Sequence, residues 1–110
     1  MTHHETHPDP DAVLLRRLVG GDVDAQAEVL ASVADTTSVG VLVAAAVLTH
    51  SVAPLTRAAI LAAGTRDRQL VVLARALVEG ADDLFDGLVR DHLASYPDHL
   101  MASWIATRTR

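Results

Sequence analysis

The chain of 110 residues contains no cysteine, no lysine and no asparagine, and it has only one Trp, one Tyr and one Phe. The absence of cysteine excludes a disulfide framework, a zinc–thiolate centre and a thiol nucleophile. Nine arginines against fourteen acidic residues give a net charge of −5, which argues against a basic nucleic-acid-binding surface over the whole chain. Any basic surface must therefore be local.

Signals for export or for membrane insertion are also missing from the sequence. Residues 1–10 are polar and acidic, without the basic start and apolar stretch of a signal peptide. The longest apolar run, 39–49, is about half the length that a helix needs to cross a bilayer. We therefore expect a cytoplasmic protein that makes no membrane contact.

Aliphatic residues dominate what is present, since 50% of the chain is hydrophobic, with 19 Ala, 15 Leu and 14 Val. This content excludes a chain that is disordered throughout, and the length suits one domain. The pattern predicts a disordered polar tail over residues 1–8 and a single helical domain over residues 9–108.

Apolar residues recur at helical spacing between glycines, prolines and capping residues, which predicts an all-α fold. The expected architecture is six or seven short helices arranged as stacked antiparallel hairpins. Helix 39–50 has no polar face and is expected at the centre. The β-branched runs 39–43 and 71–73 could form strands, but each lies within a longer alanine-containing segment, so we favour helix. The expected N-cap residues are Asp9, Asp22, Ser38, Thr65, Asp82 and Asp98.

A weak internal repeat supports the hairpin arrangement. A shift of 59 residues aligns segment 16–24 with segment 75–83 through the shared pattern Arg-x-Leu-Val-x-Gly-x-x-Asp. The pattern describes a helix end, a glycine turn and an acidic helix start. It predicts three hairpins and a closing helix, unless the shared turn is only a common feature of alanine-rich hairpins.

Residues 66–98 resemble a tetratricopeptide repeat unit. One helix ends at Gly80, the next begins with acidic residues at 82–83, and Pro97 follows at the distance usual for that family. The segment departs from the family pattern at Leu73, Phe85 and His92, where the family prefers small residues. The resemblance implies a scaffold that presents a groove to a peptide or to a partner protein.

Charge is unevenly distributed, because residues 41–78 carry +3 between two acidic segments that each carry −5. A basic middle segment could receive an acidic peptide or a phosphate, or its arginines could neutralise neighbouring helices. Several valines near these arginines lie outside the main apolar stripe. The candidate partner-binding residues are Arg57, Arg66, Arg68, Arg75, Val71 and Val78.

Histidines and clustered acids are the remaining candidates for chemistry. His3, His4 and His7 could hold Cu(II) or Ni(II) with the amino terminus, or form an ordinary polar tail. Two Asp-His-Leu triplets, 91–93 and 98–100, invite acid–base chemistry, but adjacent residues on a helix diverge by about 100°, so we assign them structural roles. The acids at 79, 82, 83 and 86 suit a helix start.

No nucleophile elbow and no phosphate-binding glycine loop occurs, and no cofactor is implied. The sequence therefore predicts a non-catalytic protein–protein interaction or adaptor domain that acts with a protein partner or as a homodimer. Two alternatives remain open. One is a small nucleic-acid-binding regulator that uses the arginines, and the other is a metal-handling or hydrolytic protein that uses the histidines and acids.

Overall fold

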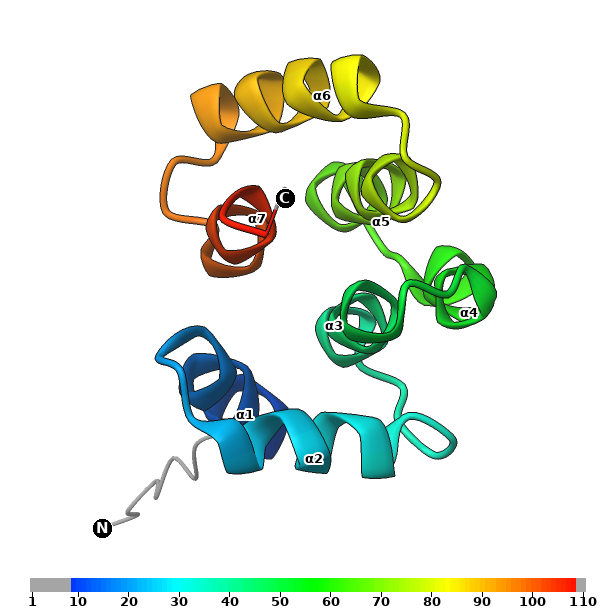
Figure 1. Ribbon diagram of the computed structural model, residues 1–110, viewed down its shortest axis with the longest axis vertical. Helices are drawn as coiled ribbons and strands as arrows, with labels where there is room; N and C mark the ends of the chain where they lie inside the picture. Colours follow the sequence, from blue (N-terminus) through cyan, green and yellow to red (C-terminus); the bar gives the residue numbers. More distant parts are fainter. Residues whose placement is uncertain (1–8, 109–110) are drawn as a thin grey trace, which may run out of the picture.

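The computed structural model describes residues 9–108, which fold into seven α-helices joined by short turns (Figure 1). The described residues contain no strand, so the predicted all-α fold is confirmed, and the valine-rich runs at 39–43 and 71–73 are helical. The predicted tail, residues 1–8, lies outside the described residues. The helices are α1 (Pro10–Val19), α2 (Val23–Ser32), α3 (Val39–Thr49), α4 (Ala53–Leu61), α5 (Thr65–Val78), α6 (Asp82–Ser95) and α7 (Leu100–Ala106).

Three helix starts are capped by the side chains that the sequence indicated. Asp9, Asp22 and Ser38 each accept a hydrogen bond from a backbone amide two or three residues further along the chain. Each bond satisfies one amide of a first helical turn that has no partner within its own helix. The starts of α1, α2 and α3 are therefore determined locally.

The predicted caps of the last three helices are wrong. Thr65 and Asp82 already lie within α5 and α6, and neither Gly64 nor Ala81, at the cap positions, makes a side-chain cap bond. Asp98 was expected to cap the last helix, but the chain makes a further turn after Pro97 and His99 takes that position. In each of these three helices the residue at the cap position makes no side-chain hydrogen bond to the first turn, and that position differs by one residue from the position that the sequence indicated.

The two copies of the internal repeat form the same turn. Gly21 and Gly80 both adopt a left-handed conformation, with φ of 93° and 75°. In each turn the glycine amide donates to the carbonyl three residues earlier, and the next amide donates to the carbonyl five residues earlier. A residue with a Cβ is strained at such a φ, which explains why glycine recurs at this step of the pattern.

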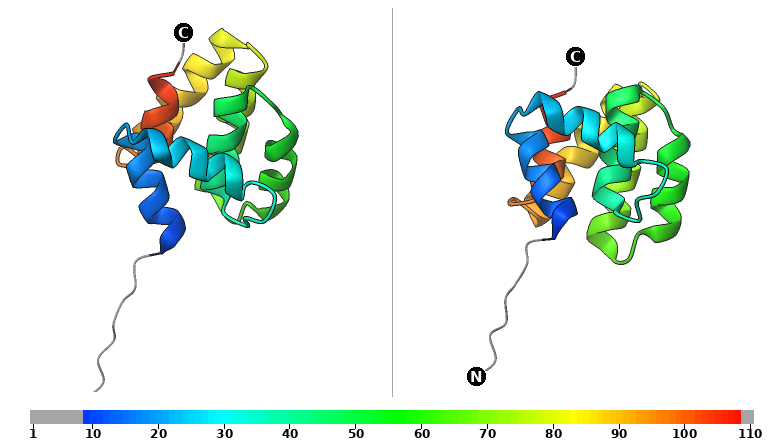
Figure 2. Two further views of the ribbon diagram at one scale, coloured as in Figure 1. Left: turned by 60° about the horizontal axis from the view of Figure 1, so that its bottom comes forward. Right: turned by 90° about the horizontal axis from the view of Figure 1, so that it is seen from below.

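The helices pack as three consecutive pairs, α1–α2, α3–α4 and α5–α6, and α7 closes the array (Figure 1). Helices α1, α3, α5 and α7 lie on the inside, where α3 and α7 contact each other and both α1 and α5, while α2, α4 and α6 lie outside them. Helix α7 returns to α1 and contacts it, and Figure 2 shows the two helices from two further sides. The inner face along which a repeat array forms its concave surface is therefore covered by α7.

The core is built around α3, as predicted. Residues 41–47 of this helix are all buried, and every other described helix except α6 contacts it. Phe85 from α6 and Trp104 from α7 add two large side chains to the aliphatic core. Leu84, next to Phe85 in the sequence, is 57% exposed, because adjacent helical residues point in different directions.

Two glycines within helices give a test of this packing. A Cβ on Gly40 would lie 2.5 Å from Cδ1 of Leu15, whereas a Cβ on Gly87 would meet nothing within 4 Å. We expect Gly87→Ala to raise the free energy of unfolding by about 0.5–1 kcal/mol, the usual gain in a helix. We expect Gly40→Ala to lower it by about 1 kcal/mol, because Leu15 must move. Urea denaturation followed by circular dichroism measures both changes, and equal stabilisation by the two variants would contradict the packing of α1 on α3.

Candidate functional site

Two of the four predicted partner-binding arginines are used within the fold. Arg57 on α4 donates through Nη1 to the carbonyl of Val33 and through Nη2 to the carbonyl of Thr36, 2.8 Å away. These carbonyls follow the end of α2, where backbone acceptors lack helical partners. Arg75 lies 3.7 Å from the carboxylate of Glu79, one turn further along the chain.

The other four predicted residues do not form one surface. Arg66 and Arg68 are exposed, and neither makes an ion pair within residues 9–108. Val71 is only 5% exposed and belongs to the core. Val78 is half-buried and lines a separate hollow together with Phe85. Arg66 and Arg68 are thus the two arginines of this set that are available for a ligand.

The structure gives no metal centre among the described residues. No three side chains of histidine, aspartate or glutamate in residues 9–108 lie close enough together to hold an ion. The predicted candidates His3, His4 and His7 lie outside the described residues. The acidic side chains at 79, 82, 83 and 86 are all exposed, as expected for the start of a helix.

A buried pair of histidines is the most unusual polar feature of the described chain. His92 on α6 is 2% exposed and His99 at the start of α7 is 6% exposed. Nε2 of His92 lies 2.6 Å from Nδ1 of His99, and Nδ1 of His92 lies 2.8 Å from Oε1 of Gln69 on α5. The Tyr96 ring packs against His92 with 4.9 Å between ring centroids. The cluster therefore joins α5, α6 and α7.

The protons of this cluster follow from its chemistry. Oε1 of Gln69 can only accept, so Nδ1 of His92 must donate to it. In a neutral imidazole the other nitrogen then accepts, so Nδ1 of His99 donates to Nε2 of His92. This leaves Nε2 of His99 as a lone-pair acceptor. Because every buried side-chain nitrogen and oxygen of the described residues has a partner, Nε2 of His99 must reach the surface.

Burial keeps both imidazoles neutral. The pKa of His99 is lowered to about 4, mainly by burial, with further lowering by Arg66 and by His92 and an opposing effect of Asp67. Burial is also the main reason that the pKa of His92 is lowered, with Arg66 again contributing. At neutral pH an imidazole with a lowered pKa therefore carries no proton to donate as a general acid, and as a base it is weaker than an ordinary histidine.

Sequence reasoning paired each histidine with its neighbouring aspartate, and it missed the pairing of the histidines with each other. The two Asp-His-Leu triplets were predicted to have structural roles rather than an acid–base role. The geometry agrees with this, because Asp91 and Asp98 are exposed and make no hydrogen bond to His92 or His99. The available signal was the separation of two histidines by seven residues across a proline turn. That separation folds the chain back, so that the end of α6 meets the start of α7.

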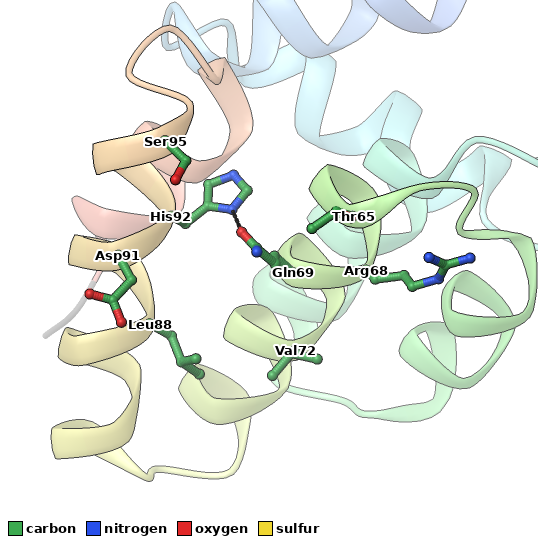
Figure 3. Close-up of a pocket in the computed structure, with 8 residues that line it drawn as sticks. All are labelled: Thr65, Arg68, Gln69, Val72, Leu88, Asp91, His92 and Ser95. Atoms are coloured by element: carbon green, nitrogen blue, oxygen red, sulfur yellow. Dashed lines mark hydrogen bonds between the residues drawn. The ribbon is translucent and has the colours of Figure 1, made fainter.

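His92 also faces a groove between α5 and α6 (Figure 3). The groove has a volume of about 410 Å³. Figure 3 shows His92 and Gln69 meeting across it, with Val72 and Leu88 further along its length. The full set of lining residues is Thr65, Arg68, Gln69, Val72, Leu88, Asp91, His92 and Ser95.

Comparison of the sequence with protein-family models and with curated proteins, and of the fold with solved structures, gives no match. The resemblance of residues 66–98 to a tetratricopeptide unit is therefore supported only at the level of consecutive packed helix pairs. Among the described helices, none combines the length and the apolar character needed to cross a bilayer.

The histidine pair makes stability depend on pH. Because the folded state holds the pKa of His99 near 4, against about 6.5 in the unfolded chain, the unfolded state binds more protons between these values. Stability is therefore complete above about pH 6.5 and declines as the pH falls toward 4. We expect the melting temperature to fall by several degrees over this range, as measured by circular dichroism.

Two variants separate this effect from other titrations. His99→Gln should flatten the pH dependence between about pH 6.5 and 4. His50→Asn, which removes an exposed histidine at a left-handed position that Asn tolerates, should leave it unchanged. The carboxylates of Asp22 and Glu28, whose pKa values Arg17 lowers through hydrogen bonds, begin to affect stability only near their ordinary pKa values of 3.8 and 4.5, at the lower end of this range. An unchanged slope in His99→Gln would contradict the assignment.

Proposed function

We propose that this protein is a non-catalytic interaction domain that binds an amphipathic helical segment of a partner protein in the groove between α5 and α6. The observation that carries the proposal is the groove itself, which combines exposed aliphatic side chains with a polar group that is fixed by the histidine pair. Val72 is 51% exposed at this groove, although it lies on a helix whose other face forms the core. Removing such a surface from water would contribute directly to binding.

The fixed polar group is the amide of Gln69. Its Oε1 accepts from His92, so its NH₂ group remains directed to other partners. His92 is itself held by His99, and this chain of bonds limits the rotation of Gln69. A preorganised donor beside an aliphatic wall is suited to a carbonyl or carboxylate of a bound segment, because little side-chain entropy is lost on binding.

The two rims of the groove carry opposite charges. Figure 3 shows Arg68 on α5 and Asp91 on α6 extending away from each other, to opposite sides. Neither makes an ion pair within residues 9–108. A complementary helix would present apolar side chains at its centre, an acidic residue toward Arg68 and a basic residue toward Asp91. Such complementarity determines orientation and specificity more than affinity.

The tetratricopeptide resemblance is consistent with this proposal, because the groove lies between the two helices of segment 66–98. The inner face is covered by α7, so the binding surface of this domain is the α5–α6 pair rather than a concave array. We propose a cytoplasmic protein partner as the occupant. The other possible occupant of the groove is a second copy of this chain. Light scattering distinguishes the two, since a homodimer formed through this groove would have twice the mass of the monomer.

Binding can be tested with a phage-displayed library of amphipathic helical peptides. We expect selected peptides to shift backbone amide resonances of α5 and α6, and Val72→Glu to weaken their binding by about tenfold or more, because a buried valine contributes about 1.5–3 kcal/mol. Val23→Glu is the matched control, since Val23 is 74% exposed on α2 and does not line the groove.

The charge of Arg68 at the edge of the groove allows a second test of the same proposal. Arg68→Glu should weaken the binding of peptides that have an acidic residue facing position 68 and strengthen the binding of peptides that have a basic residue there. Failure to select any peptide, or equal loss of binding in the Val72→Glu and Val23→Glu variants, would contradict the proposed function.

A further inference from the structure

A second hollow lies on the other side of the histidine pair, and His99 rather than His92 lines it. The hollow has a volume of about 270 Å³ and is bordered by α1, by the first turns of α3 and α5, and by the start of α7. Its polar side chains are Arg16, Arg66, Asp67 and His99, and Gly40 contributes backbone. Nothing in the proposed function uses this hollow.

The two arginines give the hollow a positive potential. Arg16 comes from α1 and Arg66 from α5, and neither forms an ion pair within the described residues. Asp67 opposes them with one negative charge, so with a neutral His99 the four groups sum to +1. An anion here would gain charge-assisted hydrogen bonds from guanidinium groups that lie on two different helices.

The first turn of α3 adds to this potential. Gly40 borders the hollow as the second residue of an eleven-residue helix, and no acceptor for its amide occurs among residues 9–108. Free amides and the helix dipole favour an anion at such a position. A Cβ at position 40 would also press on Leu15, which lines the same hollow.

The buried His99 specifies the kind of anion. Its Nδ1 is bonded to His92, whereas its Nε2 has no protein partner and reaches the surface. His99 lines this hollow and an adjoining one formed with residues 95–98, and Arg66 lines both. Nε2 carries a lone pair, so a ligand group that meets it must be a hydrogen-bond donor. The ligand must offer negative oxygens to the arginines and an O–H group to the imidazole.

We infer that this hollow is a binding site for a phosphate group that carries a single negative charge and at least one P–OH group, either inorganic phosphate or a small phosphate monoester. Arg16 and Arg66 bind its negative oxygens, and its P–OH group donates to Nε2 of His99. Sulfate has the same shape but carries no proton near neutral pH, so one of its oxygens would face the imidazole lone pair. The site should therefore discriminate between the two anions.

The discrimination can be measured by titrating the protein with inorganic phosphate and with sulfate at about pH 6, where phosphate is largely in its singly charged form, at constant ionic strength. Amide and imidazole resonances report the binding. We expect phosphate to bind at least about fivefold more tightly, although sulfate carries the larger charge, with the largest shifts at Gly40 and His99. Arg66→Gln and Arg16→Gln should each lower the affinity for phosphate by about five- to tenfold, since each removes a charge-assisted hydrogen bond.

Arg90→Gln is the matched control, because Arg90 is an exposed arginine of α6 that lines none of these hollows. It should leave phosphate affinity unchanged. Equal affinities for phosphate and sulfate, equal loss in the Arg66→Gln and Arg90→Gln variants, or no saturable binding would overturn the inference. A parallel titration with glycerol phosphate identifies the source of the group, since equal binding assigns the site to monoesters and loss of binding assigns it to free phosphate.

Discussion

The burial of residues 41–47 of α3 is the constraint on which the rest of this structure depends. The helix has aliphatic residues on all sides, and residues 41–47 are all removed from water. A helix without a polar face must be surrounded, and a chain of 110 residues can surround only one such helix. Five of the other six described helices contact α3, including α7 at the far end of the sequence. The closed arrangement follows from this requirement, and an open array of hairpins would leave one side of α3 exposed.

Closure by α7 has a chemical consequence at its first turn. To contact α1, α3 and α5, the last helix must begin close to the end of α6, and this brings His99 into a buried position beside His92. A buried imidazole without a partner would be costly, and the two rings satisfy each other while Gln69 satisfies the remaining donor. The pair is thus a product of the packing of α7, and its neutrality is the product of its burial. The two hollows beside it arise at the seams where α7 and α6 meet α5 and α1.

Local sequence predicted the features that depend on local interactions. The caps at Asp9, Asp22 and Ser38 and the repeated turns at Gly21 and Gly80 each require only neighbouring residues. The apolar pattern of α3 also indicated its central position. Features that depend on contacts across the fold were not predictable in this way. The bonds of Arg57 join residues 21 and 24 positions apart, and the bond from Gln69 to His92 spans 23 positions, so no pattern within one helix indicates them.

The first turn of α5 explains why one short segment contributes to both candidate sites. Arg66 borders the hollow beside His99, whereas Arg68, which points to the opposite side of the helix, and Gln69, one turn further along, border the groove beside His92. The histidine pair lies between these faces and is bonded to this turn through Gln69. Arg66 also disfavours the charged form of both imidazoles. An anion that neutralises Arg66 would remove this repulsion and make protonation of His99 easier, while the Nδ1 proton, and with it the bond to His92, would be retained. The electrostatic state of the hollow can therefore change without loss of the hydrogen bonds that orient Gln69 in the groove.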